Sequence, residues 1–165
     1  MPKTYARFPE LNQLLLLLDE AYNRQSWHGT NLRGSIRGLA AKQAAWRPGP
    51  RRHNIWEIVV HAAYWKYAVR RRLAGAERGT FPLKGSNWFL RPDEISERAW
   101  LTDIALLEKT HQSLRDLVGR LPARDLSKKV KGSKITNGFL IRGAAAHDLY
   151  HAGQIQLLKR LNSNS

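Results

Sequence analysis

The sequence predicts an all-α protein, a four-helix bundle with extended connecting loops. Apolar residues recur every three to four positions along most of the chain, which is the period of a helix that buries one face. No segment alternates polar and apolar residues for longer than four or five positions, so no strand is expected. Gly and Pro gather between four long periodic segments, a pattern typical of a bundle with long connections.

The first long helix is expected to begin at Pro9 and to end near Tyr22. Proline is favoured in a first helical turn because its missing N–H has no helical partner there. Four leucines make one apolar stripe along this helix: Leu11, Leu14, Leu15 and Leu18. A shorter helix is expected over residues 32–39, before a break at residues 47–50, which read Arg-Pro-Gly-Pro.

The second long helix is expected to begin after Asn54 and to end near Leu73. Asn54 is followed three residues later by Glu57, which is a capping-box signature, and Gly75 suits the end of a helix. Residues 75–92 are rich in Gly and Pro and predict a long loop. Loops of this length often form a lid or wall of a site.

The third long helix is expected from Asp93 to about Leu121, because Pro92-Asp93 is a start signal and Pro122 a stop signal. A basic connector over residues 122–134 follows. The last helix is expected to begin near Thr136 or Asn137 and to continue to about Leu161.

Composition bounds the class of protein. The chain has 165 residues, 42% of them hydrophobic, and no Cys, which excludes disulfides, thiolate nucleophiles and iron–sulfur clusters. The longest aliphatic run, Leu14–Leu18, is far shorter than the roughly 20 residues that span a bilayer. No apolar segment follows Lys3 and Arg7, so no secretory signal is expected. We therefore expect one domain over residues 1–165, located in the cytoplasm, without a membrane partner.

The charge is strongly positive. Lys and Arg number 28 against 13 Asp and Glu, a net charge of +15. Such a charge attracts anions and favours non-specific binding of nucleic acid, so a basic nucleic-acid-binding helical module is one alternative function. The basic clusters are short and scattered, at residues 51–52, 70–72 and 128–134. Solvated surface is the favoured interpretation of them.

Two histidines, His147 and His151, lie one turn apart on the apolar face of the last helix. At about 100° per residue they are separated by about 40°, and the leucines at positions 140 and 158 share their side. Buried imidazoles need partners for both nitrogens, and one shared metal ion would provide them. The alternative is a pair of core histidines bonded to each other, to Gln154 or to a tyrosine.

A third candidate ligand, His61, lies in the middle of the second long helix, which is apolar on almost every side. Glu57 lies one turn before His61 on the same face. It has two interpretations, which the sequence leaves open: the capping box with Asn54, or a metal ligand or hydrogen-bond acceptor for an imidazole N–H.

Two segments carry a resemblance to a known family. Residues 144–155, which read AAAHDLYHAGQI, together with residues 55–61, IWEIVVH, resemble the DinB/YfiT superfamily. The stretches SWHG at residues 26–29 and FPLKGSNW at residues 81–88 resemble a DinB-like subgroup. The resemblance covers roughly residues 10–161.

The resemblance implies a four-helix bundle, commonly a homodimer, with a divalent metal ion held by His61, His147 and His151. Imidazole ligands suit zinc and nickel among other metals, and three protein ligands leave a position open, as catalysis requires. Related thiol-S-transferases act on low-molecular-weight thiols such as bacillithiol, mycothiol or glutathione.

We therefore expect a divalent-metal-binding protein and a metal-dependent enzyme of thiol-S-transferase or hydrolase type. Its substrate would be a small molecule, with an anionic thiol as one candidate, and zinc or nickel its metal. A non-catalytic, metal-stabilised dimerisation domain is the other alternative to the nucleic-acid-binding module. No catalytic residue, thiol cofactor or general base is assigned.

Several neighbours of the three histidines have more than one interpretation. Tyr64 and Tyr150 border the site in the helical projection, and we expect both to fill the core. Asp148 points away from His147 and is expected to form an ion pair or to bond an imidazole, whereas Gln154 could bind a ligand or pack. The remaining histidines are expected in a loop, before a helix cap, and at a surface or interhelix hydrogen bond: His28, His53 and His111. Leu149 is expected to point outward and is a candidate interface residue.

Overall fold

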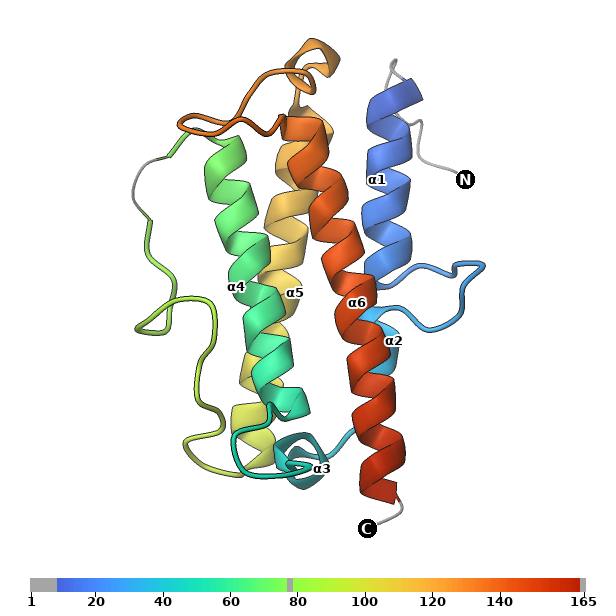
Figure 1. Cartoon of the computed structure of the whole chain (residues 1–165), viewed down its shortest axis with the longest axis vertical. Coiled ribbons are helices and arrows are strands. Elements are labelled where there is room, and N and C mark those ends of the chain that lie inside the picture. Colours follow the sequence, from blue (N-terminus) through green and yellow to red (C-terminus); the bar gives the residue numbers. More distant parts are fainter. Residues whose placement is uncertain (1–8, 77–78, 164–165) are drawn as a thin grey trace.

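The computed structural model describes residues 9–76 and 79–163. Lys3 and Arg7 lie outside the described residues. Within the described part the fold is all-α, as predicted. Four long helices run side by side (Figure 1). They are α1 (Pro9–Tyr22), α4 (Ile55–Leu73), α5 (Glu97–Arg120) and α6 (Asn137–Ser163). The connections contain two short helices, α2 (Leu32–Ser35) and α3 (Ala41–Ala45), and a 3-10 turn at Ala123–Asp125.

Side-chain caps explain where the long helices begin. The Asn54 Oδ1 atom accepts a hydrogen bond from the Glu57 N–H at 2.7 Å, so α4 begins where the sequence predicts. The expected start of α5 at Asp93 is wrong. The side chain of Ser96 accepts from the Ala99 N–H, and this cap places the first helical residue at Glu97.

The expected single helix over residues 32–39 is also wrong. Helix α2 begins after a cap in which Asn31 Oδ1 accepts from the Gly34 N–H at 2.8 Å. It ends at Ser35, and Gly38 has a φ of +73°, in a region that a helix cannot use. The chain turns there, and α3 begins only at Ala41.

The apolar core consists of two groups of side chains. One group surrounds the rings of Trp56 and Trp100, whose centroids are 5.1 Å apart. The other joins α1 to α5 and α6 through residues such as Leu18, Leu114 and Ile141. The predicted leucine stripe of α1 is therefore the face that this helix buries.

A buried ion pair joins α4 to α6. Lys66 of α4 donates to an Asp148 carboxylate oxygen, and both side chains are at most 2% exposed. The Lys66 ammonium also lies 3.3 Å from the His111 Nδ1 atom of α5 and 4.8 Å from the centre of the Tyr22 ring. Burial, with a smaller contribution from Lys66, lowers the pKa of His111 to about 2, so the neutral ring accepts this hydrogen bond. Asp148 thus forms the expected ion pair, and His111 forms an interhelix bond and is not on the surface.

None of the described helices is both long and apolar enough to cross a membrane.

The ion pair leads to a prediction about stability. Replacing Asp148 with Ala leaves the Lys66 ammonium buried without its counter-charge, which we expect to lower the free energy of unfolding by about 3–5 kcal/mol. The double variant Lys66→Met/Asp148→Leu removes both charges and should recover most of that loss. Urea unfolding of the metal-free proteins measures both effects. Equal stability of the single variant and the wild type would contradict the role given to the pair.

Candidate metal centre

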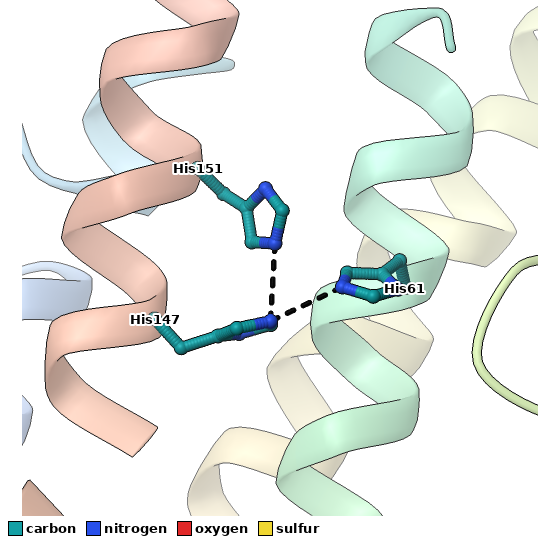
Figure 2. Close-up of side chains that lie close together, drawn as sticks. All are labelled: His61, His147 and His151. Atoms are coloured by element: carbon teal, nitrogen blue, oxygen red, sulfur yellow. Dashed lines mark hydrogen bonds between the residues drawn. The ribbon is translucent and has the colours of Figure 1, made fainter. Parts of the chain in front are cut away.

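Three histidines converge in the seam between α4 and α6, which run in opposite directions (Figures 1 and 2). The Nε2 atom of His147 lies 3.1 Å from Nε2 of His61 and 3.0 Å from Nε2 of His151. The three candidate donor atoms all lie within 4.8 Å of one another. The structure thus brings His61 next to two residues that are more than 80 positions away in the sequence.

Hydrogen bonds at the outer ring nitrogens fix two of the tautomers. His61 Nδ1 lies 2.8 Å from the main-chain oxygen of Asn87, and His151 Nδ1 lies 2.7 Å from Oε1 of Gln154. Because both oxygens only accept, each Nδ1 carries the proton. The Nε2 atoms of His61 and His151 therefore present lone pairs to the shared centre.

These lone pairs fit a cation. The Nε2 atom of His147 can carry at most one proton, and one proton cannot satisfy the two lone pairs that face it. Without a cation at least one buried nitrogen lacks a good partner, which costs about 1–3 kcal/mol. A metal ion accepts all three lone pairs at once, and the outer hydrogen bonds hold the rings as metal-binding histidines are usually held.

The environment keeps the histidines uncharged. Burial, with a smaller contribution from neighbouring imidazoles, lowers the pKa of His61 to about 4 and that of His147 to about 3. Burial lowers the pKa of His151 in the same direction. The rings are therefore neutral at pH 7, which is the form that binds a metal ion.

The loop between α4 and α5 covers one side of the centre. The Trp88 ring stacks on the His61 ring, with centroids 3.8 Å apart, and the His53 ring also stacks on Trp88, with centroids 3.6 Å apart. Asn87 has a φ of +66°, and its Oδ1 atom accepts from the Trp65 indole N–H at 2.9 Å. The expectation that this loop forms the wall of a site is consistent with these contacts.

A sequence model of the DinB superfamily matches residues 24–155 of the chain. The chain belongs to the DinB superfamily. The matched region includes all three histidines and the covering loop. No curated protein and no solved structure matches the chain.

In this DinB protein Glu57 lies outside the three-histidine group. Its N–H is capped by Asn54, but its carboxylate does not complete a capping box. It binds the Arg47 guanidinium and lies 2.9 Å from Nδ1 of His53. Because His53 stacks on Trp88, Glu57 supports the wall of the centre indirectly. The sequence alone does not indicate this, because Arg47 comes from a separate segment.

Two expectations about α6 are wrong. Tyr150 is 63% exposed and does not fill the core, although its ring lies 5.2 Å from that of His151. Leu149 is half-buried and packs against the core group that includes the leucines of α1. Tyr64 is partly buried and packs against the core, next to Phe81 and Phe89, and His28 lies exposed in a loop.

The Gln154 contact leads to a prediction about metal affinity. In Gln154→Met the His151 Nδ1–H loses its acceptor, so the ring and its tautomer are less well held. We expect the affinity for zinc to fall about 10–100-fold, as measured by competition with a chromogenic chelator. The control is Gln156→Met, a partly exposed position two residues further along α6, which should bind zinc like the wild type. Wild-type affinity of Gln154→Met would contradict the role of this bond.

Proposed function

We propose that this DinB-superfamily protein is a divalent-metal-dependent enzyme of thiol-S-transferase or hydrolase type. The observation that carries the proposal is the group of three neutral imidazoles. Among the described residues, no fourth Cys, His, Asp or Glu side chain joins this group. Structural zinc sites are closed by four protein ligands, whereas catalytic sites keep one position open. His61, His147 and His151 would hold the ion.

The chemistry of the donor set supports a small-molecule substrate. A divalent ion at this centre would favour the deprotonated form of a thiol or of water. Neutral imidazoles suit zinc and nickel and leave the positive charge of the ion uncompensated. The net charge of +15 raises the local concentration of anions, which favours an anionic thiol as one substrate.

Metal analysis of protein prepared without a His tag tests the proposal. We expect one equivalent of zinc or nickel per chain, and a free energy of unfolding raised by about 2.7 kcal/mol when free zinc is 100 times Kd. In His151→Ala both effects should be lost. In His28→Ala, which removes an exposed loop histidine, both should remain. Protein without bound metal, whose melting temperature is unchanged by zinc or nickel, would contradict the proposal.

Retention on DNA or RNA at about 0.1 M salt that survives a chelator would favour the nucleic-acid alternative.

We propose further that the protein is a homodimer that pairs through an exposed face of α6. Phe139, Tyr150, Leu157 and Leu161 are between 43% and 63% exposed, and they fall within an arc of about 40° around the helix axis. Exposed apolar residues that line up on one helix face are a common mark of a protein interface.

Light scattering after size-exclusion chromatography tests this pairing. A charge in the middle of an apolar interface would be buried, so Leu157→Glu should yield a monomer. Leu101→Glu changes an equally exposed leucine on α5 and should leave the wild-type mass unchanged. A monomeric wild type would exclude the dimer, and a dimeric Leu157→Glu variant would place the interface elsewhere.

A further inference from the structure

A cavity of about 130 Å³ lies in the seam between α4 and α6, and His147 forms part of its wall. Trp65 and Val69 line it from α4, and Phe139, Leu140 and Gly143 line it from α6. The cavity therefore lies beside the three-histidine centre, on the side toward the first turns of α6.

The walls of this cavity are almost entirely apolar. Two charged residues, Lys66 and Asp148, contribute to the lining, but they are buried and bind each other. The pair uses Oδ2 of Asp148, and two other polar groups remain in the lining: Oδ1 of Asp148, which has no hydrogen-bond partner among the described residues, and the imidazole of His147. The part of a molecule that enters this cavity would thus contact mainly hydrocarbon, with the candidate metal centre next to it.

The Trp65 side chain, which lines the cavity from α4, is held in place before any ligand binds. The Trp65 indole N–H donates to Asn87 Oδ1 at 2.9 Å, and the Arg72 guanidinium lies 5.9 Å from the centre of the indole ring. A wall that is already ordered reduces the entropy lost on binding. An apolar cavity of about 150 Å³ holds one benzene molecule, so this one fits a group of about four to six carbon atoms.

We propose that the cavity binds a short alkyl or aryl group carried by the ligand of the three-histidine centre. The proposal rests on the proposed function and narrows it. The substrate that enters this seam is a small molecule whose metal-binding atom, such as a thiol sulfur, is attached to an apolar group of about this size. Thiols that are polar along their whole length would leave the cavity unused.

Binding of simple thiols to the cobalt-loaded protein tests the proposal. The thiolate-to-cobalt absorption band reports coordination independently of any activity. The probes are ethanethiol, 1-propanethiol, 1-butanethiol, phenylmethanethiol and 3-mercapto-1-propanol. We expect Kd to fall about fourfold for each added methylene and phenylmethanethiol to bind more tightly than ethanethiol. The hydroxyl-ended thiol should bind more weakly than 1-butanethiol, because its hydroxyl would leave water for a lining that is mainly apolar.

A variant that fills the cavity sharpens the test. A Cβ atom added at Gly143 meets no atom within 4 Å, so the backbone position tolerates a side chain, and Gly143→Leu adds an apolar group to the lining. In this variant all the thiols should bind about as weakly as ethanethiol binds the wild type. The control is Gly119→Leu on α5, where an added Cβ is equally free and where the wild-type series should persist. Light scattering on both variants verifies that their oligomeric state is that of the wild type.

The outcomes separate the cavity from the centre. If cobalt binds and thiols coordinate, but Kd is independent of chain length or unchanged in Gly143→Leu, the cavity proposal is overturned and the metal centre stands. If cobalt does not bind, both proposals fail. A loss of the chain-length series in Gly143→Leu alone supports the cavity.

Discussion

Three imidazole nitrogens that face one another within 4.8 Å, at least two of them without a proton, impose the main constraint on this structure. The nitrogen lone pairs of these rings point toward one another. Buried lone pairs that face each other are unfavourable unless a proton or a cation lies between them. The constraint can be met only if α4 and α6 keep a fixed separation and register. The Lys66–Asp148 pair, which crosses the same seam, is one contact that maintains both.

The loop between α4 and α5 extends this constraint beyond the two helices. The Asn87 carbonyl directs the proton of His61 to the outer nitrogen, and Trp88 covers the face of the His61 ring. The end of the loop is anchored in turn, because the Arg91 guanidinium binds Asp103 at 2.6–2.8 Å. Asp103 also accepts from the buried indole of Trp56. The loop between α4 and α5 is therefore held against the helices, because polar groups of Asn87 and Arg91 bind side chains of α4 and α5.

The interior of the seam is electrically neutral, whereas the chain as a whole is strongly positive. Inside, the charged side chains of Lys66 and Asp148 neutralise each other, and the three histidines are neutral because burial lowers their pKa values. These residues therefore contribute nothing to the net charge of +15, which comes from the rest of the chain. A cation bound at the centre would thus be the dominant uncompensated charge within the seam, next to an apolar cavity. This arrangement favours a ligand with one anionic donor atom and an apolar body.

Much of the candidate centre followed from local rules. The helical period placed His147 and His151 on one buried face, and the cap at Asn54 placed the start of α4, because both depend on neighbours within one turn. The direction of a side chain around one helix does not reveal which element covers that side. For this reason the helical projection gave the wrong burial for two residues of α6: Tyr150 is exposed, and Leu149 is packed against the core. The period of one helix could not bring His61 to this pair, and only the resemblance of two segments to a known family indicated it. The Asn87 carbonyl, the Arg47–Glu57 pair and the cavity wall join separate segments of the chain. Only tertiary packing decided these contacts, because they depend on how helices and loops meet in space.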